Sequence, residues 1–388
     1  MRIFGRKTGM LYYIGLYSQQ QNTQNRNSVL AAVNKMNYII GAIKKNGYEQ
    51  TIVSCCTTKD KKGYAGSLDE LDKNTFLKQF RTFGRKNLIT KTADYVFMKL
   101  QLFFYLLKNI KKDDILLVYH SPFYCGLIRI IRKLKKCRLI LEVEELYSDV
   151  SGDKTLKKKE LAACDSADAF IFPTKLLSDA VNPKNKPYVL IHGTYEVEAE
   201  RKKIFNDGKI HVVYAGTFDT RKGGGSAAAA AEYLPENYHI HILGFGTDTQ
   251  INNIKKIISE TAEKSKAEVT FDGLLSGEEY ISFLQSCDIG LSTQNPDAAF
   301  NATSFPSKIL SYMANGLRVV SIRIPAIETS AVGKYMYYYE DQTPENIAKT
   351  ITEIDFNDGY NGKEVISDLD NNFSKELYTL IKDIENDN

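Results

Sequence analysis

The chain of 388 residues is longer than one ordinary domain, so it predicts two domains of roughly 150–200 residues each. Its 43% hydrophobic and 25% charged residues are the composition of a globular protein, which excludes a disordered or fibrous chain. The net charge of +4 hides an asymmetry: residues 1–138 carry 26 basic and 8 acidic side chains, whereas the remaining residues carry 25 and 39. A basic first third either attracts phosphates, acidic lipid head groups or nucleic acid, or simply keeps the surface solvated.

The beginning of the chain and its cysteines indicate a cytoplasmic protein. The apolar part of residues 1–21 is short and ends in glutamines instead of a small-residue cleavage site, so it is unlike a signal peptide. The six cysteines form no Cys-x-x-Cys pair and have no histidine at zinc-finger spacing. We therefore expect reduced, mostly buried thiols, no metal site and no obligatory cofactor.

Short apolar strands alternate with helical patterns throughout the first half. A helix is predicted from Asn27 to Asn46, where Gly47 ends it, and a long lysine-rich loop is predicted after residues 51–54. The predicted strands are residues 11–17, 51–54, 115–119, 138–144, 168–173 and 188–191. Strands that alternate with helices in this way indicate βαβ units and a parallel sheet.

The longest apolar run extends from Tyr95 to Ile110 and is interrupted by Lys99. It is shorter than the roughly 20 apolar residues that a helix needs to span a membrane. Apolar residues recur in it at helical spacing, which predicts an amphipathic helix: Val96, Leu100, Phe103, Leu107 and Ile110. This helix either packs in the protein core or lies in a membrane interface, where nearby lysines would meet lipid phosphates: Lys108, Lys111 and Lys112.

Polar residues at the ends of the first-half strands are the candidates for a substrate-binding site. His120 directly follows a predicted strand and is the candidate catalytic residue, because imidazole accepts a proton near neutral pH; the alternative is a half-buried histidine that caps the next helix. Glu144 and Glu145 lie at the end of the next strand, where they bind hydroxyl groups, act as a base or stay solvated. The amides of Gln20 and Asn22, in the loop after the first strand, suit hydroxyl groups of a substrate, although that loop can equally be mobile.

A polar segment with two prolines, residues 182–208, separates two halves of similar pattern. The second half has predicted strands at residues 210–216, 238–244, 267–273, 288–292 and 318–322. We therefore predict an α/β protein with two Rossmann-like, doubly wound domains that face a cleft. The predicted domains are residues 1–190 and 205–370, followed by a C-terminal helix at 371–388 that can pack back on the first domain.

Two basic clusters of the second half are suited to phosphate. Arg221 and Lys222 follow the strand that ends at Gly216 and precede three glycines, so this flexible turn can close on a pyrophosphate. Lys308 lies in the first turn of a predicted helix, where it opposes the helix dipole unless an anion is bound; the alternative is a side chain that points into water. No dinucleotide fingerprint or P-loop is present, which argues against NAD binding and ATP hydrolysis.

Taken in order, the motifs of the second half resemble the group 1, or family 4, glycosyltransferases of GT-B fold. The resemblance extends over Val212 to Ile322 and includes YAGT…RKGG, HILGFG, VTFDGLLSGEEYISFLQSCDIGLS and FPSKILSYMANGLRVVS. The first half matches only in outline, although His120-Ser121-Pro122 stands where the family often has His-x-Pro.

The resemblance implies individual roles. Lys222 would bind the donor's pyrophosphate, and Thr303 and Ser311 stand where the family usually has two glutamates, near the transferred sugar and the donor's ribose. Thr217 replaces an arginine that often follows the Gly216 position. Thr303 is therefore a second candidate catalytic residue. The candidate donor-binding residues are Gly216, Arg221, Lys222, Gly244, Gly246, Phe271, Gly273, Ser307, Lys308 and Ser311.

The resemblance implies transfer of a sugar from a nucleotide-diphosphate donor to a hydroxyl of a glycan or lipid-linked oligosaccharide, with retention, in the synthesis of a cell-surface polysaccharide such as a capsule or exopolysaccharide. The basic first domain fits an acceptor in an anionic membrane, so we expect a cytoplasmic protein attached peripherally to the inner face of the cell membrane, with no nucleic-acid partner. Two alternatives are a catalytically silent GT-B subunit that supports a partner enzyme, favoured by Thr303 and Ser311, and a nucleotide-sugar epimerase.

Overall fold

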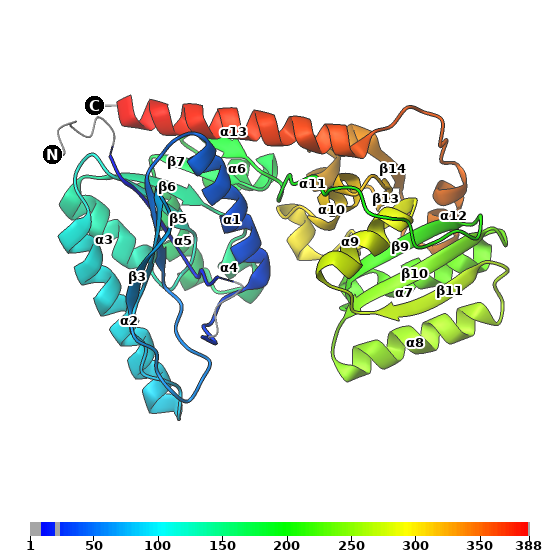
Figure 1. Ribbon diagram of the computed structural model, residues 1–388, viewed down its shortest axis with the longest axis horizontal. Coiled ribbons are helices and arrows are strands. Elements are labelled where there is room, and N and C mark those ends of the chain that lie inside the picture. Colours follow the sequence, from blue (N-terminus) through cyan, green and yellow to red (C-terminus); the bar gives the residue numbers. More distant parts are fainter. Residues whose placement is uncertain (1–8, 20–23, 387–388) are drawn as a thin grey trace. The chain divides into compact units, whose positions relative to one another are not determined.

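A computed structural model of the chain describes residues 9–19 and 24–386 (Figure 1). The chain forms two compact units: unit 1 comprises Met1–Ile191 and Asn372–Asn388, and unit 2 comprises His192–Asn371. Two candidate acceptor-binding residues, Gln20 and Asn22, lie outside the described residues.

Unit 1 is built on an eight-stranded sheet with the order β3-β4-β2-β1-β5-β6-β7-β8. Every pairing is parallel except that of the edge strand β3 with β4. The strands are β1 (Leu11–Gly15), β2 (Gln50–Ser54), β3 (Ser67–Asp72), β4 (Thr75–Gln79), β5 (Ile115–Tyr119), β6 (Arg138–Glu142), β7 (Ala169–Phe172) and β8 (Tyr188–Leu190). Because β1 and β5 are neighbours and their connections leave in opposite directions, the sheet has a topological switch point there.

Helices connect these strands and bury the apolar faces of the sheet. They are α1 (Leu30–Lys45), α2 (Leu88–Asn109), α3 (Cys125–Lys135), α4 (Tyr147–Ser151), α5 (Lys154–Ser166) and α6 (Lys175–Val181). Helix α1 ends where Gly47 takes the left-handed φ of 79°, as the sequence predicts. The core contains cysteines together with aliphatic and aromatic side chains, and all six cysteines of the chain are buried and free, which confirms the sequence prediction.

The predicted lysine-rich loop after residues 51–54 is wrong in part, because it contains strands β3 and β4. β3 has the sequence SLDELD and lies at the sheet edge, where most of its side chains are exposed or half-buried. An edge strand with little buried surface lacks the alternation of apolar and polar residues by which strands are recognised. Tertiary pairing with β4 therefore decides its conformation.

Helix α2 is longer than its apolar run, and its buried face matches the predicted one only in part, since Phe103, Leu107 and Ile110 do contact the core. A capping box fixes its start, since Asn87 accepts a hydrogen bond from the Thr90 amide. The buried positions are Asp94, Met98, Leu102 and Leu106. By contrast, Val96 and Leu100 are 54% and 48% exposed, although both belong to the predicted apolar face.

Unit 2 contains a six-stranded, entirely parallel sheet with the order β11-β10-β9-β12-β13-β14. The strands are β9 (Ile210–Thr217), β10 (Tyr238–Phe245), β11 (Glu268–Gly273), β12 (Ile289–Ser292), β13 (Arg318–Ile322) and β14 (Met336–Tyr339). This order is that of the dinucleotide-binding Rossmann fold, with the switch point between β9 and β12. The edge strand β14 is absent from the sequence prediction.

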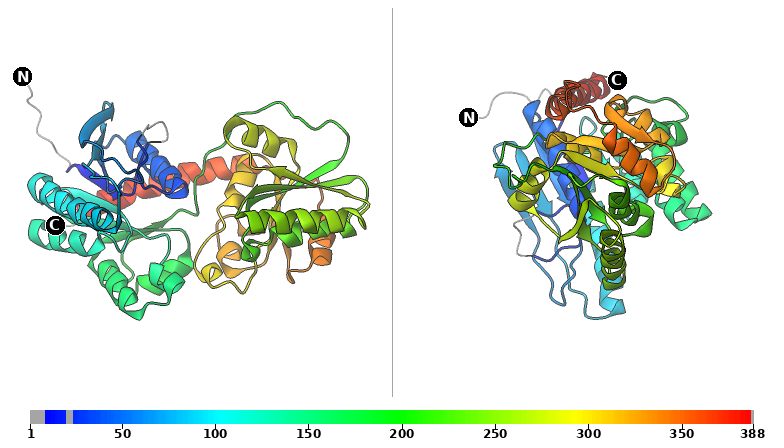
Figure 2. Two further views of the ribbon diagram at one scale, coloured as in Figure 1. Left: turned by 90° about the horizontal axis from the view of Figure 1, so that it is seen from below. Right: turned by 90° about the vertical axis from the view of Figure 1, so that its right-hand side faces the viewer.

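The helices of unit 2 lie on both faces of its sheet (Figures 1 and 2). They are α7 (Gly224–Ala229), α8 (Asp248–Ala262), α9 (Gly277–Ser286), α10 (Lys308–Ala314), α11 (Pro325–Glu328) and α12 (Pro344–Thr352). The last helix, α13 (Gly362–Asn386), begins in unit 2 and ends in unit 1. In unit 1 the Asn46 side chain donates a hydrogen bond to the Ser374 carbonyl (3.1 Å), and Phe373 stacks on Tyr38.

Candidate functional site

A cavity of about 250 Å³ opens at the switch point of the unit 2 sheet. Ends of parallel strands at such a point are the usual ligand sites of doubly wound sheets. The cavity is formed by the carboxyl end of β9, the turn that follows it, the segment after β12 and the start of α10. Its lining residues are Ala215, Gly216, Thr217, Lys222, Gln294, Asn301, Ser304, Phe305, Pro306, Ser307 and Lys308.

Lys308 places a buried cation in this cavity. Its ammonium nitrogen is buried and has no hydrogen-bond partner among residues 9–19 and 24–386. The nitrogen lies 3.9 Å from the ring centroid of Tyr214, whose π face offsets part of the charge. Burial, and secondarily the charge of Lys222, lower the Lys308 pKa to about 7. An anion in the cavity would raise the Lys308 pKa again, because a partner of opposite charge favours the protonated amine.

Gln294 provides a second unsatisfied donor in the same cavity. The Ser292 hydroxyl donates to its Oε1 atom (2.9 Å), which fixes the orientation of the amide. Its Nε2 atom is buried, and no acceptor for it exists within the described part of the chain. A buried donor without a partner is destabilising by about 1–3 kcal/mol. Two such donors in one cavity indicate that a ligand with acceptor atoms belongs there.

The turn after β9 carries Lys222 to the cavity and requires glycine. Lys222 ends a short 3-10 helix, and Gly223 follows with a left-handed φ of 77°. A Cβ atom on Gly223 would lie 1.6 Å from the Thr293 carbonyl oxygen, so no other residue fits. The neighbouring Arg221 is exposed and pairs with Asp219 (2.6 Å), and it does not line the cavity. The structure thus separates the two members of the predicted basic pair.

The predicted glycines of β10 have local structural causes. A Cβ atom on Gly244 would lie 1.7 Å from the Gly216 carbonyl oxygen, so Gly244 allows β10 to approach β9. A Cβ atom on Gly246 would meet the Gln250 side chain at 2.8 Å. Phe271 and Gly273 lie at the end of β11, where Lys255 sits 5.0 Å from the Phe271 ring centroid. None of these four residues lines the 250 Å³ cavity.

The hydroxyl residues around α10 divide into two groups. Ser307 is the N-cap of α10 and lines the cavity, although its side chain makes no capping hydrogen bond. Thr303 is half-buried between the lining residues Asn301 and Ser304 but is not itself a lining residue. Ser311 lies one turn into the helix, where its side chain hydrogen-bonds the Tyr280 hydroxyl.

In unit 1, His120 is held by protein partners on both sides of its ring. Its Nε2 atom lies 2.9 Å from Glu160 Oε1, its Nδ1 atom lies 3.4 Å from Cys125 Sγ, and the residue is only 1% exposed. Burial lowers the His120 pKa, but the hydrogen bonds from Cys125 and Glu160 outweigh burial and raise it to about 9. These contacts leave His120 within the packed end of β5, beside Tyr147.

Acidic residues at the end of β6 form a second buried network in unit 1. Glu142 is fully buried and accepts a hydrogen bond from the Tyr13 hydroxyl. Burial, together with the charge of Glu144, raises the Glu142 pKa to about 8. Glu144 is paired with Lys35 (2.5 Å), and that lysine also donates to the Ile191 carbonyl (3.0 Å). Glu145 is half-buried beside this network.

The sequence analysis missed several residues that line the cavity in unit 2. Gln294 and Asn301 belong to the stretch after β12 that precedes the motif beginning at Phe305, and this stretch carries no recognised motif. The available signal was the position of Gln294, two residues after a buried strand, because the carboxyl ends of parallel strands converge on one edge of the sheet. Phe305 forms an apolar wall of the cavity, and the His192 ring lies 4.9 Å behind it.

Comparison with known proteins gives one sequence match and many structural matches. Residues 209–354 match the family model of group 1 glycosyl transferases, which covers the strands and helices that form the cavity. No curated protein sequence matches the chain significantly.

The similar solved structures cover nearly the whole chain. One, described as trehalose-6-phosphate from E. coli bound with UDP-2-fluoro glucose, has a TM-score of 0.68 at 10% identity and covers 97% of this chain and 99% of that one. An α,α-trehalose-phosphate synthase (UDP-forming) from Burkholderia xenovorans in complex with glucose-6-phosphate has a TM-score of 0.65 at 10% identity, over 97% and 98%. The Candida albicans trehalose-6-phosphate phosphatase N-terminal domain has a TM-score of 0.64 at 12% identity, over 99% and 98%. At such low identity, these likenesses establish the fold alone.

Proposed function

We propose that this chain, which carries a group 1 glycosyltransferase domain at residues 209–354 on a GT-B fold, transfers a sugar from a nucleoside diphosphate donor held in the unit 2 cavity. The observation that carries the proposal is a pair of buried donors, Lys308 Nζ and Gln294 Nε2, which lie in one cavity with Lys222 and have no acceptor among the described residues. A diphosphate supplies both the negative charge and the acceptor oxygens that these groups require.

The chemistry of glycosyl transfer fits this set of side chains. When the bond from the sugar to the diphosphate breaks, negative charge grows on the leaving oxygen, and fixed cations stabilise it in the transition state. Lys308 is best placed for this role because its nitrogen is buried, and electrostatic interactions are stronger where water is excluded. Lys222 adds a second positive charge at the cavity wall.

Uridine is the first base to test. The E. coli structure with the same fold is described with bound UDP-2-fluoro glucose, and the Burkholderia xenovorans protein is described as UDP-forming. We propose UDP-sugars as donors on that ground. The acceptor is proposed on separate evidence, which is the exposed surface of unit 1.

The surface of unit 1 supports a membrane-bound acceptor, such as a lipid-linked oligosaccharide. Helices α2 and α3 lie side by side (Figure 1) and expose an apolar stripe that consists of Val96, Leu100, Phe104, Ile130 and Leu134. These five side chains are 48% to 62% exposed. Exposed basic residues alternate with them along both helices: Lys99, Lys108, Arg129 and Lys133.

Apolar side chains within a basic surface match an anionic bilayer, into which the stripe would insert while the lysines meet lipid phosphates. Among the described helices, none has the length and hydropathy that a membrane crossing requires. We propose that unit 1 attaches peripherally to the inner face of the cell membrane and that the product contributes to a cell-surface glycan.

A turnover assay tests the transferase activity. The chain is incubated with a panel of UDP-sugars and with either lipid-linked acceptors or glucose 6-phosphate, and release of UDP is measured. Acceptor-dependent release supports the proposal, and Lys222→Ala should abolish it. Tight UDP binding without turnover would instead favour a silent subunit, and conversion of the donor sugar without an acceptor would favour an epimerase.

Sedimentation with lipid vesicles tests the membrane surface separately. The chain should sediment with anionic vesicles at low salt and dissociate at high salt. The triple variant Val96→Asn, Leu100→Asn, Phe104→Asn should sediment less, whereas Leu274→Asn, at a 66% exposed position of unit 2, should behave like the parent. Equal binding to neutral vesicles would contradict the electrostatic attachment.

A further inference from the structure

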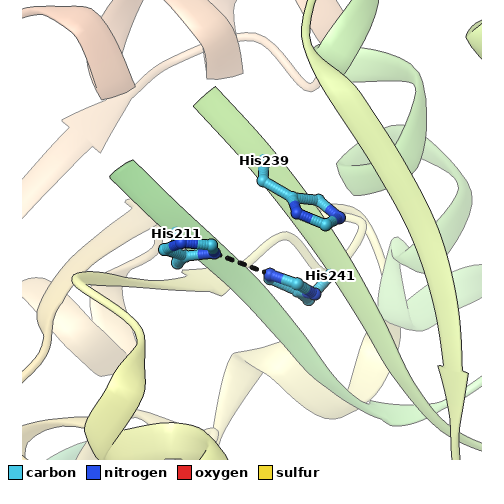
Figure 3. Close-up of side chains that lie close together, drawn as sticks. All are labelled: His211, His239 and His241. Carbon is cyan, nitrogen blue, oxygen red and sulfur yellow. Dashed lines mark hydrogen bonds between the residues drawn. The ribbon is translucent and has the colours of Figure 1, made fainter. Parts of the chain in front are cut away.

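Three of the five histidines of the chain lie together at the amino-terminal half of the unit 2 sheet (Figure 3). His211 belongs to β9, and His239 and His241 alternate on the adjacent strand β10. No motif in the sequence connects them, because 27 residues separate His211 from His239. Parallel pairing places His211 directly opposite His239, so all three imidazoles share one face.

The ring nitrogens of these histidines lie at the spacing of a metal-binding triad. One nitrogen from each ring falls within 4.8 Å of the others. His211 Nδ1 and His241 Nε2 are 2.9 Å apart, and the centroids of the His239 and His241 rings are 3.9 Å apart. A His-x-His pair on one strand and a third histidine on its neighbour supply three neutral nitrogen ligands, the set that zinc uses when its fourth position stays open.

Each histidine also has a carboxylate beside the ring nitrogen that points away from the proposed ion. His211 Nε2 lies 2.9 Å from Asp207 Oδ1, His241 Nδ1 lies 3.3 Å from Asp272 Oδ2, and His239 Nδ1 lies 3.2 Å from a Glu268 oxygen. Metal-ligating histidines characteristically donate their second N–H to such groups, which fix the tautomer and the ring orientation. Three carboxylates around three imidazoles also give the cluster the negative charge that a divalent cation requires.

One side of the histidine cluster is covered by an aromatic ring, and the other is open to solvent. Phe205 stacks on His211 and His241 with centroid distances of 4.1 and 4.8 Å, which shields the cluster from water. Glu268 is 56% exposed and Asp207 is 47% exposed, so solvent reaches the cluster past these carboxylates. Three adjustments are needed. The hydrogen bond between His211 Nδ1 and His241 Nε2 (2.9 Å) must give way to the ion, His239 Nε2 must leave Thr270 Oγ1 (3.0 Å), and Glu268 must leave Lys209 (2.8 Å).

We propose that His211, His239 and His241 form a binding site for a divalent first-row metal ion with a preference for imidazole, of which zinc is the principal candidate. Asp207, Asp272 and Glu268 are its positioning residues. The ion would join β9 to β10, with β11 tied in through Asp272. The site is separate from the donor cavity, because His211 is the second residue of β9 whereas Gly216 and Thr217 end it. It therefore acts on the stability of unit 2 and takes no part in sugar transfer.

Titration of the metal-stripped full-length protein with zinc chloride alone tests the site. Isothermal titration should show one equivalent of zinc bound, and the melting temperature should rise with zinc concentration because the ion binds the folded state. His239→Gln should weaken zinc binding at least tenfold. This variant is suited to the test because the His239 side chain is 12% exposed, so its replacement disturbs packing least. Asp272→Asn should weaken binding about tenfold through loss of the positioning contact.

His192→Gln is the matched control, since His192 lies in unit 2 but outside the cluster, and it should bind zinc like the parent. Cobalt substituted for zinc should give the intense visible spectrum of a four-coordinate site. Absence of stoichiometric zinc binding by the parent, or equal affinity of the parent and His239→Gln, would overturn the proposal.

Discussion

His120 in unit 1 and Lys308 in unit 2 both place a buried basic nitrogen near the carboxyl ends of parallel strands, but they differ in their partners. His120 contacts Glu160 and Cys125, and Glu160 in turn accepts hydrogen bonds from the amides of Tyr147 and Ser148, each at 2.9 Å. Lys308 lies over the face of Tyr214 and has no hydrogen-bond acceptor in the described part of the chain. The first arrangement is complete without a ligand, whereas the second is not.

This difference in hydrogen-bond partners distinguishes a structural role for His120 from a ligand-binding role for Lys308 more clearly than residue type does. A buried charge with hydrogen-bonded partners contributes to the fold, and its loss destabilises the protein. A buried charge without them is costly in the empty protein and becomes favourable only when an anion binds. The effects of substitution at the two positions should therefore differ in kind.

The largest expected effect is on donor binding at Lys308. Lys308→Met should raise the dissociation constant of UDP at least about 100-fold, because the variant lacks the only buried charge of the cavity's described lining. The empty variant should melt at the same or a higher temperature than the parent, since an apolar side chain replaces an unpaired charge. Lys349→Met, at an exposed position of α12, is the control for calorimetry with UDP. Unchanged UDP affinity in Lys308→Met would remove the basis of the proposed donor site.

The next largest expected effect is on the stability that the hydrogen bonds around Glu160 provide in unit 1. Glu160→Gln should lower the free energy of unfolding by about 2 kcal/mol, because the amide cannot accept the hydrogen bonds of His120, Tyr147 and Ser148 together. Urea denaturation measures the change, and UDP affinity should not change. A variant as stable as the parent would show that the His120–Glu160 pair makes no net contribution to the free energy of unfolding.

A smaller effect is the pH dependence of UDP binding. The Lys308 pKa of about 7 means that half of the empty protein carries a neutral amine at neutral pH. Because UDP binds the protonated form, its apparent dissociation constant should rise about fivefold from pH 7 to pH 8. Lys308→Met provides the control with a flat profile over this range. A parent profile that is equally flat would mean that Lys308 stays protonated when the cavity is empty.

The smallest effect is the pH dependence of stability through Glu142. Its folded-state pKa of about 8 lies above the usual value, so the folded state holds a proton that the unfolded state has released. The stability that this proton provides is present at low pH and is lost as pH rises through 8. Between pH 7 and 9 the parent should lose about 1 kcal/mol more than Glu142→Gln in thermal unfolding. Parallel pH profiles of the two proteins would contradict a neutral Glu142.

The parts of the fold that the sequence predicts are those with buried, periodic apolar residues. The central strands of both sheets and helix α1 are of this kind. The sequence also predicts that the six cysteines are free and mostly buried, and they are. The edge strands β3 and β14 escaped prediction because an edge strand needs few buried side chains. The predicted buried face of α2 was wrong in part because its run is apolar on most sides, so periodicity does not distinguish the core face.

The candidate site shows the same division. Motifs identified Gly216, Lys222, Ser307 and Lys308, which the structure brings into one cavity although 84 residues separate Ser307 from Lys222 in the chain. Gln294 and Asn301 line it without any motif, and Arg221 and Gly244 belong to its neighbourhood but not to its wall. Side-chain direction at the end of a strand depends on the neighbouring strands, which a linear pattern does not contain.

By itself, the sequence determined the alternation of strands and helices, the two halves, and the residue types that can hold phosphate, because these follow from local periodicity and from motifs within short segments. Tertiary structure alone decided which polar atoms remained without partners and which histidines came together. Hydrogen bonding and burial depend on contacts between segments far apart in the chain. The cavity around Lys308 and the cluster of His211, His239 and His241 could be recognised only after those contacts were known.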